Sequence, residues 1–191
     1  MKVSREQAAQ NRERILDAAA RLFRERGFEG IGVADTMKAA GLTHGAFYGH
    51  FSSKEDLIAQ ACARAFSRSH ERWSKMVVRT PDDPLSSIVG SYLSRRHRDD
   101  PGTGCTLAAL GPDIARHDSG VRRAVADGLR SAFNLLSGLV PGKSEAARRQ
   151  KAISTYATLV GAMIMARAVD DATLSQEILD AAQVSVSASG T

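Results

Sequence analysis

The stretch KAAGLTHGAFYGHFSSKEDL, residues 38–57, decides how this chain of 191 residues folds. It begins inside a short helical segment at about 33–40, turns at Gly41, and continues into a second short segment at about 43–50. Two short helices joined by a tight glycine turn form a helix-turn-helix. The sequence therefore predicts this motif near the N-terminus.

The second short segment has two different faces. At about 100° per residue, Phe47 and Phe51 fall on one side, and Gly45, Ala46 and Gly49 fall roughly opposite. A nearly bare backbone face is what a helix needs to enter the major groove of DNA. We therefore expect the phenylalanine side to pack against the protein and the glycine side to face DNA.

Polar side chains surround this bare face. Thr43 and His44 lie at its N-terminal end, where side chains meet base edges. Tyr48 and His50 flank it and are placed to bind phosphates, as is Lys54 in the first turn of the following helix. Phosphate contacts position a protein on DNA but do not select the sequence.

Helix signals extend on both sides. Ser4 and Gln7 form a capping box that starts a first helix ending at Gly27. Ser52 and Glu55 form a second capping box, which is expected to start a long helix that runs to about Val78.

Apolar positions recur at helical spacing almost throughout, without the alternation typical of strands. The fold class is therefore all-α: a three-helix N-terminal head at 1–53, joined by a long helix at 54–79 to a larger helical bundle, with the body at 54–191. Further helices are expected at 84–98, 105–116, 119–139, 144–169 and 173–186.

The run AGLTHGAFYGHFSSKEDL, residues 40–57, resembles the signature of the TetR (tetracycline-repressor) family of one-component regulators, and so does RGFEG at 26–30. The alternative, that Phe47, Tyr48 and Phe51 only fill the core of an ordinary bundle, is disfavoured by the length of the match. The resemblance implies a regulator that contacts DNA through Thr43, His44, Gly45, Ala46, Tyr48, His50 and Lys54.

The last two predicted helices carry apolar residues on more than one face. The same pair in TetR-like regulators packs against its two-fold mate as a four-helix bundle, so the resemblance implies a homodimer. The alternative is that these helices only complete the core of the monomer. The expected interface residues are Tyr156, Val160, Met163, Ile164, Leu174 and Ile178.

A small apolar or electrophilic effector is expected to bind in the body. Cys105 follows a Gly-Thr-Gly segment and opens a predicted helix, whose dipole favours the thiolate. The surrounding segment is similar to the cysteine region of TetR-like members that sense electrophiles, although an inert buried cysteine fits the same pattern. Cys62 is expected in the core. Besides Cys105, the candidate effector contacts are Trp73, Tyr92, Leu107 and Phe133.

Composition and residue spacing bear on the partner, the location and the chemistry of the protein. The net charge of +5 suits a polyanionic partner such as double-stranded operator DNA. No signal peptide or membrane span is visible, so we expect a cytoplasmic protein with two reduced cysteines. No metal site and no cofactor are implied. An enzyme would need Cys105 with His117, which is not a recognised pairing.

The sequence therefore predicts a DNA-binding transcriptional repressor that an effector releases from its operator. The alternative is an architectural DNA-binding dimer without a switch, which would bind all duplexes alike.

Overall fold

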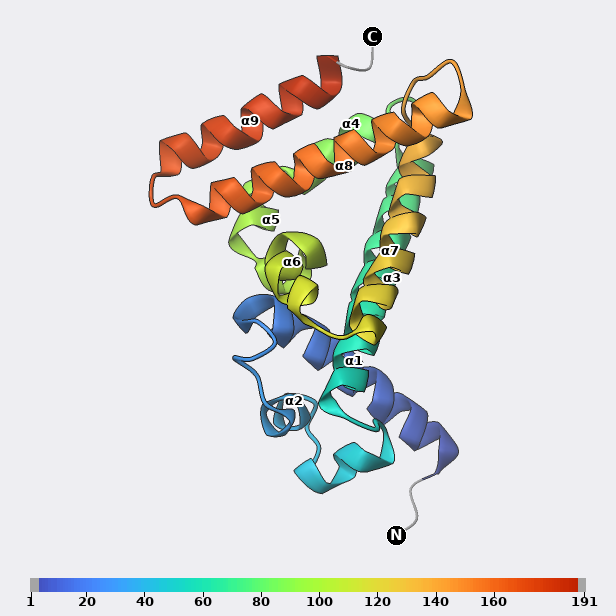
Figure 1. The fold of residues 1–191 in the computed structure, drawn as a ribbon, viewed down its shortest axis with the longest axis vertical. Coiled ribbons are helices and arrows are strands. Elements are labelled where there is room, and N and C mark those ends of the chain that lie inside the picture. The colour runs from blue at the N-terminus through green and yellow to red at the C-terminus, as the bar shows by residue number, and fades with distance from the viewer. Residues whose placement is uncertain (1–3, 189–191) are drawn as a thin grey trace.

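A computed structural model describes residues 4–188, and within that range it contains helices and no strands (Figure 1). The all-α prediction is therefore confirmed. The helices are α1 (Arg5–Arg26), α2 (Val33–Ala39), the 3-10 helix η1 (His44–Gly49), α3 (Lys54–Arg79), α4 (Pro84–Tyr92), α5 (Arg95–Asp99), the 3-10 helix η2 (Pro101–Thr103), α6 (Thr106–Arg116), α7 (Ser119–Ser137), α8 (Glu145–Ala168) and α9 (Ala172–Ala188).

The first helix begins and ends where the sequence predicts. The Ser4 hydroxyl accepts a hydrogen bond from the Gln7 backbone N–H at 3.1 Å, and α1 ends at Gly27 with φ 76° and ψ 167°. That backbone region is almost closed to residues with a Cβ atom. The buried face of α1 includes Ile15 and Phe23, which anchor the head to the rest of the core.

The turn of the helix-turn-helix depends on Gly41, which has φ 70°. Its N–H donates to the Lys38 carbonyl, and the next N–H, from Leu42, donates to the Met37 carbonyl, both at 2.9 Å. A Cβ atom at position 41 would also lie only 2.7 Å from the guanidinium of Arg14. The positive φ is therefore what favours glycine here, since the Arg14 side chain could move aside for a Cβ atom.

Two predicted boundaries are wrong. The cap of α3 is Ser53 and not Ser52, because the Ser53 hydroxyl accepts from the Asp56 N–H while the Asp56 carboxylate accepts from Ser52, each at 3.0 Å. The expected helix at 84–98 is two helices, since the Ser94 hydroxyl accepts from the His97 N–H and starts α5.

The head and the body share core residues. Ile15, Phe23 and Phe47 of the head belong to one apolar cluster with Ile58 of α3 and Val125 of α7. A second cluster joins α3, α4, α7, α8 and α9. Figure 1 shows α3 and α7 running together from the head toward α8 and α9. The boundary at residue 53 therefore stays a prediction. The two units that it separates share one apolar core.

Within residues 4–188, no helix combines the length and the apolar character that crossing a membrane would require.

Candidate functional site

The short helix η1 is anchored by Phe47 within it and by Phe51 just after its end. Phe47 and Phe51 are buried and stack with ring centroids 5.7 Å apart. The guanidinium of Arg12 lies 5.1 Å above the Phe51 ring, which is a cation–π contact from α1. The anchored side of η1 is therefore fixed to the head, as the sequence predicts.

The opposite side of η1 is open. Thr43, His44 and Gly45 are exposed, Tyr48 is 72% exposed, and a Cβ atom added at Gly45 or Gly49 would meet no other atom within 4 Å. In the described part of the chain, no hydrogen bond or ion pair uses the side chain of Thr43, His44 or Tyr48. This surface is polar, close to the backbone and not occupied by the protein itself.

Three other candidate DNA contacts are less exposed. Ala46 is half-buried and packs against the head core, because a 3-10 helix turns its residues by more than an α-helix does. His50 is half-buried beside the Phe51 ring, and Lys54 is half-buried as the first residue of α3. The fully bare face is therefore narrower than the α-helical pattern predicts.

The body contains a cavity of about 320 Å³ among α3, α4, α5, α6, α7 and α8. Three predicted effector contacts, Trp73, Tyr92 and Cys105, line it. Two others do not: Leu107 packs in the apolar clusters, and Phe133 lies behind the wall, edge-to-face on Tyr156 with centroids 5.6 Å apart. Helical spacing alone cannot distinguish residues that line the cavity from residues that pack behind them.

Cys105 is the N-cap of α6 and is only 7% exposed. Its sulfur lies 3.5 Å from the Tyr156 hydroxyl oxygen, and its backbone N–H donates to Nε2 of His97 at 2.9 Å. Cys62 is buried in the head cluster as predicted, and burial raises the pKa of its thiol to about 12. Both cysteines are free.

His97 is a site residue that the sequence analysis missed. Its Nδ1 lies 2.6 Å from the Tyr92 carbonyl oxygen, and its Nε2 accepts from the Cys105 N–H. The two contacts together require the neutral ring with its proton on Nδ1. Burial is the main cause that lowers the pKa of His97 to about 4, and Arg167, Arg72 and Arg24 lower it further.

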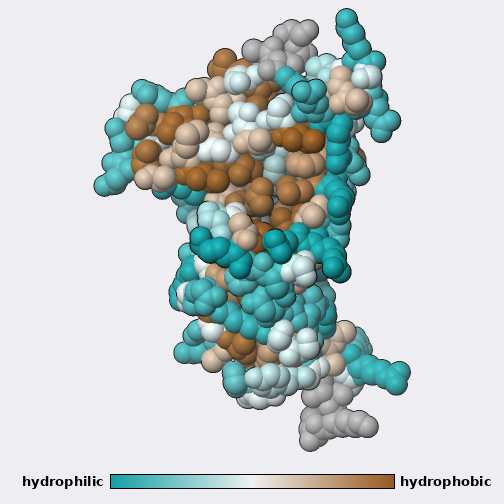
Figure 2. Space-filling model, in the orientation of Figure 1, coloured by the Kyte–Doolittle hydropathy of each residue, from teal (hydrophilic) through white to brown (hydrophobic). Residues whose placement is uncertain are grey.

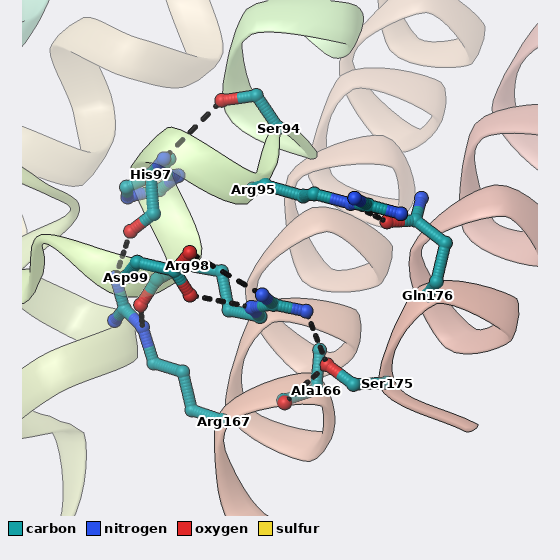
Figure 3. Close-up of polar contacts among 9 residues, drawn as sticks. All are labelled: Ser94, Arg95, His97, Arg98, Asp99, Ala166, Arg167, Ser175 and Gln176. Carbon is teal, nitrogen blue, oxygen red and sulfur yellow. Dashed lines mark hydrogen bonds and ion pairs between the residues drawn. The ribbon is translucent and has the colours of Figure 1, made fainter. Parts of the chain in front are cut away.

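Helix α5, which carries His97, is fastened to the last two helices (Figure 3). Arg167 of α8 donates to the carbonyl oxygens of His97 at 2.5 Å and Arg98 at 3.0 Å. The Arg98 guanidinium donates to the Ser175 hydroxyl at 3.0 Å, and that hydroxyl donates to the Ala166 carbonyl at 2.7 Å. The wall of the cavity is therefore tied directly to α8 and α9.

The same segment reaches the head. Arg24 of α1 donates to the carbonyl oxygen of Gly102, with its Nε at 3.0 Å and Nη2 also in contact. Burial, and next the charge of Arg72, lower the pKa of Arg24 to about 10. Residues 95–105 thus contact the cavity, the α8–α9 pair and the N-terminal head at once.

The structure does not bring Cys105 and His117 together. His117 instead lies between head and body, with its Nδ1 3.1 Å from the Glu55 carboxylate and its ring edge-to-face on Phe28. The pairing that an enzyme would need is not formed.

The surface of α8 and α9 corrects part of the expected dimer interface. Tyr156, Val160 and Met163 are buried inside the protomer, because they face the second core cluster. Ile164 and Leu174 are about two-fifths exposed, at 41% and 42%, and Ile178 is half-buried. Figure 2 shows apolar residues gathered over the upper part of the molecule, around α8 and α9, above a mostly polar head. Further exposed apolar residues of these helices are Ile153, Met165 and Val184.

Comparison with known proteins places these features in context. Residues 15–61 match the family model described as bacterial regulatory proteins, tetR family. The chain is 36% identical over 85 residues to the HTH-type transcriptional regulator AcrR of Shigella flexneri, a match that covers 44% of this chain and 40% of that protein. It is 26% identical over 129 residues to the HTH-type transcriptional repressor NemR of Escherichia coli K12, covering 66% of this chain and 65% of that one. The chain thus spans less than two thirds of both relatives.

Solved structures match over nearly the whole chain. The reduced form of E. coli NemR has a TM-score of 0.77 at 25% identity and covers 93% of this chain and 95% of that one. A TetR transcriptional regulator from Legionella pneumophila has a TM-score of 0.79 at 16% identity, with complete coverage of both chains, which shows the fold alone.

Proposed function

We propose that this chain, whose residues 15–61 match the model of the tetR family of bacterial regulatory proteins, is a sequence-specific transcriptional repressor that binds operator DNA as a homodimer and is released by an effector in the body. The observation that carries the proposal is the unoccupied polar face of η1. An effector cavity that is linked to the same head supports the switch.

The DNA contacts divide into two groups. Thr43 and His44, at the start of η1, read base edges, and Gly45 lets the backbone approach the groove closely. Tyr48, His50 and Lys54 bind phosphates and set the position of the head. Replacing a base-reading residue changes which sequence is preferred, whereas replacing a phosphate contact weakens binding to all sequences and lowers its salt dependence.

The dimer forms through the exposed apolar face of α8 and α9. Exposed Ile164 and Leu174 need a covering partner, and a second copy of the chain presents the same face. A two-fold dimer carries two heads, which suits half-sites about 34–36 Å apart in successive major-groove turns.

The effector acts through residues 95–105. A ligand against Trp73 and Tyr92 displaces the loop that His97 and Cys105 share, and Arg24 transmits the displacement to α1. Because α5 is also bound to α8, the displacement reaches the dimer helices as well and changes the spacing of the two heads. The ligand shifts DNA binding by as much as its affinity differs between the two states.

Cys105 is the proposed site at which electrophiles act. Its thiol adds to the β-carbon of an α,β-unsaturated carbonyl: the S–C bond forms as the S–H bond and the C=C π bond break, and the proton passes through water to the α-carbon, which takes the π electron pair. The bulky adduct then separates Cys105 from Tyr156 and opens the wall of the cavity.

The test is selection of bound sequences from random DNA, followed by titration of the selected operator at fixed salt with and without N-ethylmaleimide. Operator binding that is lost on treatment in the wild type and in Cys62→Ser, but kept in Cys105→Ser, supports both the repressor and its cysteine sensor. Operator binding that N-ethylmaleimide does not change contradicts the cysteine sensor and still supports the repressor. Equal binding to all duplexes contradicts the repressor and favours an architectural protein.

A further inference from the structure

The charges around the cavity are of one sign. Its lining includes the guanidinium-bearing Arg72 and Arg96 and the imidazoles of His70 and His97, but no aspartate or glutamate. Asp100 is acidic and close to Arg96, but it lies outside the lining and accepts a hydrogen bond from the Thr103 hydroxyl at 2.8 Å.

Neither arginine forms an ion pair within residues 4–188. In the described residues, Arg96 makes no side-chain hydrogen bond or ion pair. Arg72 makes only two long contacts, to the Thr103 carbonyl oxygen and the Ser69 hydroxyl, both at 3.3 Å. By contrast, the neighbouring Arg98 forms an ion pair with Asp99 at 2.7 Å. Two cations at one cavity therefore lack a carboxylate partner.

The inner wall is aromatic and carries an unused donor. Trp73 packs edge-to-face on Tyr92 and on Tyr156, with centroids 6.2 Å and 6.0 Å apart. Tyr92 is only 5% exposed, and its hydroxyl forms no hydrogen bond within residues 4–188, although the Cys105 thiol lies nearby. Burial, and next the neighbouring Cys105, raise the pKa of Tyr92 far above its ordinary value, so the hydroxyl keeps its proton and can donate it in a hydrogen bond.

We propose that the effector of this cavity is an amphipathic organic anion, a carboxylate on an aromatic or aliphatic body. The carboxylate binds Arg72 and Arg96, and the body lies against Trp73 and Tyr92. This inference rests on the proposed function for the ligand's role as effector, but not for its binding. A volume near 320 Å³ is at the small end of ligand cavities, which favours a compound with one or two rings.

The physical reason is charge compensation. Arg72 and Arg96 are both exposed and border the cavity without a carboxylate partner, and a charge-assisted hydrogen bond from guanidinium to carboxylate is about twice as strong as a neutral one. A cationic ligand would be repelled by both arginines, and a neutral ligand would leave both unpaired. The anion satisfies them and the Tyr92 hydroxyl together.

The chain provides its own reporter for the test, because Trp73 is its only tryptophan and lines the cavity. We would titrate the full-length protein at pH 7 with 3-phenylpropanoate and with 3-phenylpropanamide, which have the same size and differ in charge. Quenching of Trp73 fluorescence gives the affinity of each without any DNA. The carboxylate is expected to bind at least about tenfold more tightly than the amide.

Matched variants test whether Arg72 and Arg96 cause the preference for the carboxylate. In Arg72→Gln/Arg96→Gln the preference for the carboxylate is expected to disappear. In Arg95→Gln, which removes a neighbouring arginine that pairs with Gln176 outside the cavity, it is expected to remain. The unliganded fluorescence spectrum and the helical content check that each variant is folded.

Equal affinity for the two probes, tighter binding of the amide, or no quenching by the carboxylate at millimolar concentration would overturn the proposal. Loss of the preference in Arg95→Gln would also overturn it, because the effect would then come from general charge. If the protein prefers the carboxylate but the carboxylate does not release the selected operator, the proposed ligand class is supported and its role as effector is contradicted.

Discussion

Protonation of His97 should destabilise the folded protein in acid. Its Nε2 accepts the Cys105 N–H at 2.9 Å only as the neutral ring, and its pKa falls from the ordinary 6.5 to about 4. The unfolded chain therefore binds more protons than the folded one between these values. Stability is highest above pH 6.5 and is lost as the pH falls toward 4.

The magnitude follows from the size of the shift. Each pKa unit corresponds to about 1.4 kcal/mol, so the lowered pKa of His97 predicts a loss of about 3 kcal/mol by pH 4. This is a large part of a typical folding free energy of about 5–15 kcal/mol. The loss of unfolding free energy should be large enough to detect beside the pH dependence that the carboxylates contribute.

The assay compares the wild type with His97→Gln at one protein concentration. Glutamine can accept the Cys105 N–H but does not titrate, and every other group is common to both proteins. Free energies of unfolding in urea at pH 7, 6, 5 and 4 should show the advantage of the wild type over the variant shrinking by about 3 kcal/mol. A difference that stays constant over this range would refute the assignment of His97 as a neutral acceptor.

Three other predictions follow from the contacts. Arg24→Met should change the unfolding free energy by less than about 2 kcal/mol, since the lost hydrogen bonds to Gly102 are partly offset by removal of a largely buried charge that lies near Arg72; effector release of DNA should nevertheless weaken, and release as in the wild type would contradict the relay. Gly27→Ala should cost about 1–3 kcal/mol in urea unfolding, whereas Gly45→Ala should leave stability within about 0.5 kcal/mol and weaken operator binding. Ile164→Glu should shift sedimentation toward the monomer, while Val78→Glu, at a more exposed apolar position of α3, should not; the same shift in both would contradict the proposed interface.

The sequence determines much of the head, because its signals are local. The Ser4 cap, the glycines at 27 and 41, and the spacing of Phe47 and Phe51 each act within one or two helical turns. Their consequences can be read without knowing what packs nearby. The neighbouring Ser52 and Ser53 show the limit of local reading, since both can cap and only the Asp56 contact decides between them.

The body depends on contacts between distant residues. Tyr156 and Met163 look like interface residues because α8 is apolar on more than one face, and only packing shows which face the protomer covers. His97 meets Cys105 across eight residues, and Arg24 meets Gly102 across 78, through turns that no periodicity predicts.

The sequence by itself therefore determined the helices, the helix-turn-helix and the family resemblance, since these depend on propensity, capping and spacing along the chain. The tertiary structure alone decided which aromatic side chains line the cavity, which arginines face it without a partner, and which apolar face remains open. These properties depend on how helices far apart in the chain pack together.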